Sequence, residues 1–514
     1  MFQVILLLSA PFVSGLLLFL ALPGFDLGFL AWLGLAPLLF AVRQRGPLVA
    51  AGLGFLFGFV FGGGGFYWLN AIPFVTTSRF FLMVAAFSFY YLVFGLLYNL
   101  TSRRMGSWMI VGGPALWVAL EYARANLGFL ALAWNFLGDS QYRYLPWIQI
   151  ADITGVYGVS FLVVMVNQCL SQLPGLRGAR RWQWGPQLAV VALLLPATLL
   201  YGWQKLAEPE GGQHVRVALV QANRLARDNK SLRDLTAHLQ AYGRLTQEAA
   251  RDKPDLIVWP SSSLPAPFGS WLVRGPVNRI AAQAEGYLLV GGAGGDKFAP
   301  PRDGYLPYSN SEFLISPAGR LEGQYNKVHL TPFSEYIPLY GKVKWPRWIT
   351  TLEKSFVPGE AYTLFNVSGA RFGAPICWEN SFPHLFRRFV LDGANFMVSV
   401  TNEGLFGATS GPYQTLTMNV FRAVENRVTV ARAATTGVSA FINSKGKIVE
   451  RIRNADGKDL FVSGVLVRDV PLSKKRTFYT LYGDVFARAA TGAAALMLAL
   501  SVLTARRARF EAFP

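Results

Sequence analysis

One of the chain's two cysteines, Cys377, stands where a thiol could act as a nucleophile. It follows the apolar segment 372–376 and precedes the polar stretch 378–380, so we expect it at a turn that ends a strand. The thiolate is the reactive form, and a free thiol with a pKa of about 8.5 needs a nearby base or cation to ionise at neutral pH. The segment alone also fits a buried structural cysteine, the commoner fate of a lone thiol. Cys169 lies in an apolar run, so no disulfide framework is expected.

Three other groups of polar residues bear on this chemistry. Lys327 and Glu335 flank a rigid Pro-Phe turn within segment 325–339, which by itself would be a solvated loop. Ser261 begins a run of three serines, but no Gly-x-Ser-x-Gly elbow surrounds it, which argues against a serine hydrolase. His329 belongs to a chain with only four histidines and no metal-ligand spacing, so we expect no metal site.

Four stretches of the soluble part carry a recognisable order of motifs. They are Trp259-Pro260, Tyr325 to Leu339, Cys377-Trp378-Glu379 and Thr401-Asn402-Glu403. Together they resemble the motifs of the nitrilase, or carbon–nitrogen hydrolase, superfamily. The resemblance implies an αββα sandwich that carries a triad of glutamate, lysine and cysteine.

Further motifs in the apolar parts of the chain narrow the resemblance. They are Leu22-Pro23-Gly24-Phe25-Asp26, Ala31-Trp32, Asn135 to Gln141, Gly155-Val156-Tyr157-Gly158, Asn167 and Thr480 to Asp484. These motifs are similar to those of apolipoprotein N-acyltransferases, and the resemblance covers nearly the whole chain. A membrane-tethered amidase would use the same triad, but it would not need the matching membrane part.

The resemblance implies a ping-pong acyl transfer. Cys377 would take an acyl chain from a phospholipid donor as a thioester, and the α-amino group of a diacylglyceryl-cysteine on a lipoprotein acceptor would then receive it. Lys327 would favour the thiolate and stabilise the tetrahedral oxyanion. Glu335 would hold Lys327 or move protons. The resemblance implies no cofactor and no metal.

Four residues are candidates for substrate binding near the cysteine. Trp378 and Phe406 would line an acyl pocket or pack beneath one, and packing is the commoner role of such aromatic side chains. Glu379 would take part in the reaction or anchor the turn through backbone amides. Asn402 belongs to the motif Thr-Asn-Glu and completes the set.

The clearest departure from the family pattern is Ser261, which stands where the general-base glutamate belongs after Trp-Pro. A serine hydroxyl has no useful basicity near neutral pH, and loss of a positioned base typically costs ~100- to 10,000-fold in rate. Other departures near the same site are Glu403 in place of aspartate, Thr415 in place of histidine and Thr436 in place of asparagine. Either a neighbouring carboxylate such as Glu335 or Glu379 acts instead, or the chain is a weakened or inactive paralogue that binds lipoproteins or phospholipids. An engineered change at position 261 would not explain the other departures.

The composition is that of a membrane protein. Hydrophobic residues make up 52% of the 514 residues, charged residues only 15%, and the mean hydropathy is +0.32, which indicates several bilayer spans. Apolar runs of spanning length cover Phe2–Leu22, Leu27–Val42, Leu48–Leu69, Arg79–Leu100, Trp108–Tyr122, Val156–Leu173, Leu188–Trp203 and Val485–Thr504. The net charge of +19 would suit nucleic acid, but the arginines lie between apolar runs and not along one basic face, so no nucleic-acid partner is expected.

Arginine clusters predict the orientation, because cytoplasmic loops collect Lys and Arg. The clusters follow runs two, four, six and eight, and they are Arg43 and Arg45; Arg103 and Arg104; Arg177, Arg180 and Arg181; Arg506, Arg507 and Arg509. We therefore expect a multi-pass protein of the bacterial plasma (inner) membrane, with both termini in the cytoplasm and a catalytic domain on the periplasmic side. The predicted domains are 1–207 with seven spans, 208–475, and 476–514 with the last span, in a monomeric protein.

The segment 208–475 has the pattern of an α/β domain, in which short strands alternate with amphipathic stretches. The predicted strands are Val215–Gln221, Leu256–Trp259, Tyr287–Gly291, Phe313–Ser316, Arg371–Cys377, Phe396–Thr401, Val438–Ile442 and Phe461–Val467. A helix is expected over 412–425, and the residues 427–432 then enter another strand. The predicted fold class is thus a polytopic α-helical membrane bundle of about eight spans plus an αββα nitrilase-type domain.

Overall fold

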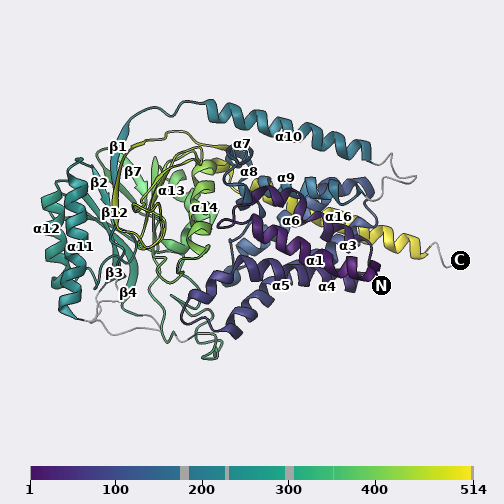
Figure 1. Cartoon of the computed structure of the whole chain (residues 1–514), viewed down its shortest axis with the longest axis horizontal. Helices are drawn as coiled ribbons and strands as arrows, with labels where there is room; N and C mark the ends of the chain where they lie inside the picture. Colours follow the sequence, from purple (N-terminus) through teal and green to yellow (C-terminus); the bar gives the residue numbers. More distant parts are fainter. Residues whose placement is uncertain (1, 174–183, 226–230, 296–305, 351, 511–514) are drawn as a thin grey trace. The chain divides into compact units, whose positions relative to one another are not determined.

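The structure, a computed structural model, describes residues 2–173, 184–225, 231–295, 306–350 and 352–510. The chain divides into two compact units, Met1–Glu208 with Tyr482–Pro514, and Pro209–Leu481. The first unit is helical, and the second contains both β-sheets (Figure 1).

The helical unit has helices over the predicted apolar runs. They are α1 (Phe2–Ala21), α2 (Ala31–Gly34), α3 (Ala36–Arg43), α4 (Pro47–Gly65), α5 (Thr77–Ser102), α6 (Met109–Asn126), α7 (Leu145–Ile148), α8 (Ala151–Thr154), α9 (Val156–Leu170), α10 (Trp184–Ala207) and α16 (Val485–Phe510). Among the described residues, four stretches are long and apolar enough to cross a bilayer, namely Pro47–Gly65, Thr77–Ser102, Gly185–Ala207 and Val485–Thr504. Three shorter apolar helices, Ser9–Ala21, Gly28–Arg43 and Val156–Leu170, accompany them, and the number of eight spans stays a prediction.

The second apolar run is interrupted between α2 and α3. Pro37 lies in the first turn of α3, where its missing N–H is no loss. The N–H groups of Leu35 and Ala36 donate to Asn167 Oδ1 at 2.8 and 2.9 Å, and Asn167 Nδ2 donates to the carbonyl of Ala31 at 2.8 Å. The buried motif residue Asn167 thus satisfies the backbone groups at this break, as buried backbone groups require.

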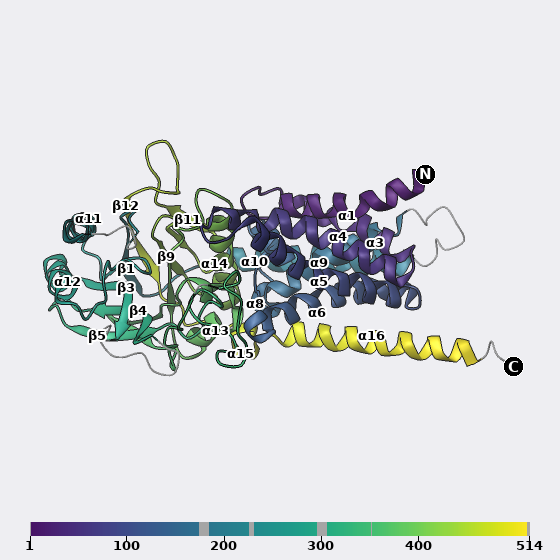
Figure 2. The same ribbon diagram turned by 90° about the horizontal axis from the view of Figure 1, so that it is seen from below.

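Two of the arginine clusters lie together at one end of this unit. Asn99 Nδ2 donates to the carbonyls of Val42 and Arg45, both at 2.7 Å, and the Arg103 guanidinium also donates to the Arg45 carbonyl. Figure 2 shows α3, the start of α1 and the end of α16 at the same end. The third cluster, Arg177, Arg180 and Arg181, lies outside the described residues.

The second unit is an αββα sandwich, as predicted. Its six-stranded sheets have the orders β12-β1-β2-β3-β4-β5 and β11-β10-β9-β8-β7-β6. The strands are β1 (His214–Gln221), β2 (Leu256–Val258), β3 (Tyr287–Gly295), β4 (Tyr308–Ile315), β5 (Leu321–Asn326), β6 (Leu364–Val367), β7 (Ala370–Gly373), β8 (Phe396–Thr401), β9 (Val430–Ala434), β10 (Ala440–Ile442), β11 (Ile448–Arg451) and β12 (Gly464–Pro471). Helices α11 (Leu232–Ala250) and α12 (Trp271–Ala284) cover the first sheet, and α13 (Pro383–Leu391) and α14 (Gly411–Asn426) cover the second (Figure 1). The short helix α15 (Phe478–Tyr482) follows β12.

The strand expected to lead directly into Cys377 is shorter than predicted. β7 ends at Gly373, because Pro375 has no N–H with which to continue the ladder. Beyond it, only Ile376 forms an isolated bridge, to Val400. The cysteine therefore lies past the sheet, in a turn whose shape depends on other contacts.

Candidate active site

Cys377 occupies a sharp turn beyond the end of β7. It is half-buried, it opens the 3₁₀ turn Cys377–Ser381, and its φ is 50°. This left-handed conformation costs a residue other than glycine roughly 1–2 kcal/mol. Such a conformation persists only where the surroundings hold it, and it is common at active sites.

Glu379 supplies many of the contacts that hold the turn. Its Oε1 accepts hydrogen bonds from the Tyr325 hydroxyl at 2.8 Å and from the N–H groups of Val328 and His329 at 2.9 and 3.0 Å, and its Oε2 accepts one from the Ile376 N–H at 2.7 Å. Burial raises the pKa of this carboxyl, although a nearby lysine and the backbone donors oppose the rise. Because both oxygens are engaged within the protein, the geometry favours the anchoring role over a role in the reaction.

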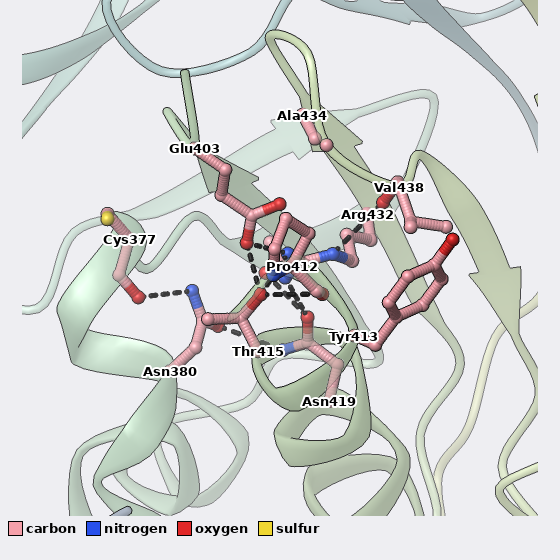
Figure 3. Close-up of polar contacts among 12 residues, drawn as sticks. Cys377, Asn380, Glu403, Pro412, Tyr413, Thr415, Asn419, Arg432, Ala434 and Val438 are labelled. Atoms are coloured by element: carbon pink, nitrogen blue, oxygen red, sulfur yellow. Dashed lines mark hydrogen bonds and ion pairs between the residues drawn. The ribbon is translucent and has the colours of Figure 1, made fainter. Parts of the chain in front are cut away.

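A second network supports the turn from behind (Figure 3). The Cys377 carbonyl accepts a hydrogen bond from Asn380 Nδ2 at 3.1 Å, and Asn380 Oδ1 accepts one from Asn419 Nδ2 at 3.2 Å. Asn419 Oδ1 in turn accepts one from Arg432 Nη1 at 2.6 Å. Asn380, Asn419 and Arg432 are all buried, so α14 and β9 help to set the position of the cysteine.

Two departures from the family pattern meet in this network. Glu403 pairs with the Arg432 guanidinium and accepts a hydrogen bond from the Thr415 hydroxyl, which accepts one from Arg432 Nη2 at 2.9 Å (Figure 3). Glutamate is longer than the family's aspartate, and threonine is smaller than the family's histidine. The two changes are thus opposite in side-chain size, and both side chains take part in the layer behind the turn, where Glu403 Oε2 has no hydrogen-bond partner among the described residues.

Lys327 is a buried cation that directly follows β5. Its side chain is 1% exposed, and its Nζ lies 2.6 Å from Glu335 Oε2 and 3.3 Å from Thr331 Oγ1. Glu335 is held in turn, because its Oε1 accepts a hydrogen bond from Asn310 Nδ2 at 2.9 Å and its Oε2 accepts one from the Thr331 N–H at 2.7 Å. This geometry fits the expectation that Glu335 holds Lys327.

The charges around Lys327 couple it to the thiol. Burial alone lowers the pKa of Lys327, but the negative charges of Glu335, Cys377 and Glu379 outweigh burial and raise the pKa. Burial alone raises the pKa of Glu335, but Lys327 and the hydrogen bonds lower it overall. The lysine therefore remains an ammonium, and a buried cation is a group that stabilises a nearby thiolate or oxyanion.

The position of the family's general base holds no carboxylate. Ser261 lies in the loop after β2 and is buried. Glu312 on β4 is fully buried next to this loop, so its carboxyl group lies beside Ser261. Glu312 is not among the site residues that the sequence predicts. The predicted strand began at Phe313, one residue too late to include Glu312. The signal that could have revealed it is a single acidic residue in an otherwise uncharged, buried strand.

The other candidates for substrate binding lie around the turn. Trp378 is half-buried, with its ring centroid 5.6 Å from that of Phe382. Asn402 Oδ1 accepts hydrogen bonds from the Gly404 N–H at 3.3 Å and the Thr435 hydroxyl at 3.0 Å. Phe406 is half-buried in the loop that follows β8. Contact of these residues with substrate stays a prediction.

Comparison with known proteins defines the class of this site. Residues 216–478 match the family model described as carbon-nitrogen hydrolase. The unit that contains Cys377 and Lys327 is therefore an enzyme domain of the carbon–nitrogen hydrolase superfamily. A solved amidase of the nitrilase superfamily, from Nesterenkonia AN1, is 18% identical, with coverage of 54% of this chain and 95% of the amidase and a TM-score of 0.38.

The helical unit identifies the family within that class. Residues 14–169 match the model of the apolipoprotein N-acyltransferase N-terminal domain. The apolipoprotein N-acyltransferase of Geobacter metallireducens is 36% identical over 504 residues, which cover 95% of this chain and 94% of the relative. That of Chlorobaculum tepidum is 29% identical and covers 97% of this chain and 98% of its own length. The chain belongs to the apolipoprotein N-acyltransferase family, whose members are membrane-associated acyltransferases of lipoprotein maturation.

Proposed function

We propose that the protein transfers an acyl chain from a phospholipid to the N-terminal amine of diacylglyceryl-cysteine on lipoproteins, through a thioester on Cys377. The observation that carries this proposal is the buried Lys327 ammonium, which lies 2.6 Å from Glu335 and whose pKa is raised by the surrounding charges, that of Cys377 among them. A thiolate beside a fixed cation is a strong nucleophile. The same cation stabilises the oxyanion that forms when the thiolate attacks an ester.

The reaction has two halves that use the same groups. In the first, the Cys377 sulfur attacks the ester carbonyl of the phospholipid, the ester C–O bond breaks and a lysophospholipid leaves. In the second, the lipoprotein amine attacks the thioester carbonyl, an amide forms and the cysteine is released. Each half passes through a tetrahedral oxyanion, which Lys327 stabilises. A single oxyanion donor contributes ~100- to 1,000-fold in rate.

The acyl chains of both substrates account for the membrane unit. Exposing an acyl chain to water costs about 0.8 kcal/mol per methylene group. Substrates that remain in the bilayer avoid this cost. Trp378 and Phe406 are the proposed lining of the acyl pocket. Their half-buried rings leave apolar surface for a chain to contact.

The orientation completes the proposal. The protein is placed in the bacterial inner membrane with both termini in the cytoplasm and the catalytic unit in the periplasm, and it acts as a monomer. The support is that the clusters at Arg45 and Arg103 meet at one end of the helical unit, as a shared cytoplasmic face requires.

Intact-mass spectrometry tests the thioester. The detergent-purified full-length protein is incubated with phosphatidylethanolamine, and the wild type is compared with Cys377→Ala, Cys169→Ala and Ser261→Glu. We expect an acyl adduct on the wild type, no adduct on Cys377→Ala and an unchanged adduct on Cys169→Ala, which removes the chain's other thiol from α9.

The Ser261→Glu variant addresses the alternative of an inactive paralogue. An adduct that forms only in this variant would mark the natural chain as a disabled acyltransferase that binds lipoproteins or phospholipids. An adduct on the wild type establishes a working nucleophile in the absence of the usual glutamate.

A further inference from the structure

Glu312 differs from the other buried carboxyl groups in the described part of the chain. Its side chain is 0% exposed, and neither of its oxygens has a hydrogen-bond partner among the described residues. Leaving a buried polar group without a partner costs roughly 1–3 kcal/mol. Native structures contain few such groups, and each calls for an explanation, of which a catalytic role is one.

Gly291 gives Glu312 room to reach across the sheet. The two residues are direct cross-strand partners on β3 and β4. A Cβ atom on Gly291 would lie 2.5 Å from Glu312 Oε1 and 2.6 Å from Ser261 Cα. The carboxyl group therefore passes over the bare glycine backbone and ends beside Ser261, in the loop after β2. A glutamate at position 261 would extend its own side chain into this neighbourhood.

The face of the sheet that carries Glu312 also carries the lysine. Glu312 is paired with Tyr325, and the next pair on that face is Asn310 with Lys327, whose N–H donates to the Asn310 carbonyl at 2.8 Å. Diagonal neighbours on one face of an antiparallel pair are about 7–8 Å apart, within reach of long side chains. The Tyr325 hydroxyl reaches the cysteine turn, so this face is the one that meets the nucleophile.

We propose that Glu312 is the general base and general acid of this enzyme, and that it performs from β4 the proton transfers that the family assigns to a glutamate at position 261. The inference rests on the proposed function, because it concerns the same thioester chemistry. Glu335 and Glu379, the carboxylates that the sequence offers as replacements, are less suited. Each has both oxygens engaged by donors within the protein.

Protons balance through Glu312 in both halves of the reaction. The Glu312 carboxylate first accepts the proton of the Cys377 thiol, and the resulting thiolate then attacks the ester carbonyl. When the C–O bond breaks, the carboxylic acid returns that proton to the departing lysophospholipid oxygen. In the second half, the carboxylate accepts a proton from the attacking amine and returns it to the departing cysteine sulfur. No further reactant is needed.

The surroundings of Glu312 suit a group that exchanges protons. Burial raises the pKa of its carboxyl well above the ordinary value, and a general base is most effective when its pKa lies near the working pH. The other titratable groups on this side are Tyr325, Lys327, His329 and Glu335 from β5 and the loop after it, and Cys377 and Glu379 from the turn. The pKa of His329 is lowered to about 4 by burial, so its titration lies below the neutral range.

Relocation of the base tests the inference. Four full-length proteins in detergent, the wild type, Ser261→Glu, Glu312→Ala and the double variant, are mixed with phosphatidylethanolamine, and the initial rate of adduct formation on Cys377 is measured. Glu312→Ala is expected to slow this rate by ~100- to 10,000-fold. The double variant is expected to recover most of the loss, because its new carboxylate enters the vacated space. Ser261→Glu alone is expected to react more slowly than the double variant, because two carboxyl groups then share one space.

Stability and pH dependence separate a catalytic role from a structural one. Glu312→Gln keeps the shape of the side chain and removes its acidity. It is expected to melt no lower than the wild type and to lose the rise of the acylation rate with pH that a titrating base produces. Glu322→Gln, the same chemical change at an exposed position of β5, is the matched control and is expected to keep the wild-type rate and pH profile.

The wild type's own adduct distinguishes this inference from the proposed function. If the wild type forms the adduct and Glu312→Ala forms it as quickly, Glu312 is not the proton carrier, although the thioester chemistry stands. The same conclusion follows if a double variant that melts like the wild type fails to recover. An adduct seen only with Ser261→Glu overturns the inference, and a complete absence of adducts overturns both proposals.

Discussion

The two sides of the active site are built in opposite ways. On one side, the Lys327 ammonium and the Glu335 carboxylate lie 2.6 Å apart, and Glu379 has both oxygens hydrogen-bonded. On the other side, Ser261 contributes no carboxylate, and Glu312 is buried with no partner among the described residues. Groups that are fully paired hold their positions, and their protons are fixed by their partners. A buried carboxyl group without hydrogen-bond partners has no such contacts to fix its position, and no partner competes for its proton. The comparison therefore supports the proposal that the first side positions the reacting groups and that Glu312, on the second side, transfers protons.

Removal of the lysine is expected to have the largest effect on the paired side. Lys327→Met leaves the nearly buried Glu335 without its cation, and breaking a buried ion pair costs about 3–5 kcal/mol. The loss of oxyanion stabilisation should also slow adduct formation by ~100- to 1,000-fold. Melting in detergent and the adduct rate measure the two effects, with the exposed Lys342→Met as the control. Wild-type melting in Lys327→Met would contradict a structural pairing with Glu335.

The stability that Glu312 contributes should change with pH in the opposite direction to the stability that Glu335 contributes. The unfolded chain releases a glutamate proton near pH ~4.3, whereas folded Glu312 keeps its proton to higher pH because burial raises its pKa. Between these two pKa values the folded state binds more protons, so the wild type loses stability as pH rises, by at most about 1.4 kcal/mol per pH unit. Glutamine does not titrate.

The melting temperature of Glu312→Gln relative to the wild type should therefore increase as pH rises above about 5. The pKa of Glu335 is lowered, so its contribution to stability is present above its unfolded pKa and is lost as pH falls through the lower folded value. Melting curves of both proteins across this range test the contrast. A constant difference at every pH would mean that Glu312 is not protonated differently in the folded and unfolded states.

The smallest effect is expected in the network behind the turn. Thr415→Val removes one hydroxyl from the layer but leaves the ion pair between Glu403 and Arg432 in place. The hydrogen bonds of this hydroxyl to Glu403 and from Arg432 are both lost, so stability should fall by about 1–3 kcal/mol, while the adduct rate should stay close to that of the wild type. Melting in detergent measures the first quantity. A strong loss of rate without a change in melting would instead place Thr415 in the reaction itself.

Much of the paired side could be predicted, because its members lie in short motifs. Lys327 and Glu335 are eight residues apart in one loop, and Cys377 stands at a recognisable polar turn. The engagement of Glu379 could not be derived, because its partners Tyr325, Val328 and His329 lie about fifty residues away in the chain. Glu312 was missed for a similar reason, since its relation to Ser261 passes through a third residue on another strand.

The sequence by itself determined the membrane character and the α/β class of the soluble unit, and it predicted the nucleophile with its lysine, because hydropathy, strand patterns and motif order are local properties of the chain. Only the tertiary structure decided which buried carboxyl groups have hydrogen-bond partners, and that neither oxygen of Glu312 has one among the described residues. That outcome depends on the register of β3 against β4. It also depends on Gly291, which has no side chain and so leaves room for Glu312 to reach the loop after β2. Distances between residues far apart in sequence set hydrogen bonding and burial, and these in turn set where a proton is held.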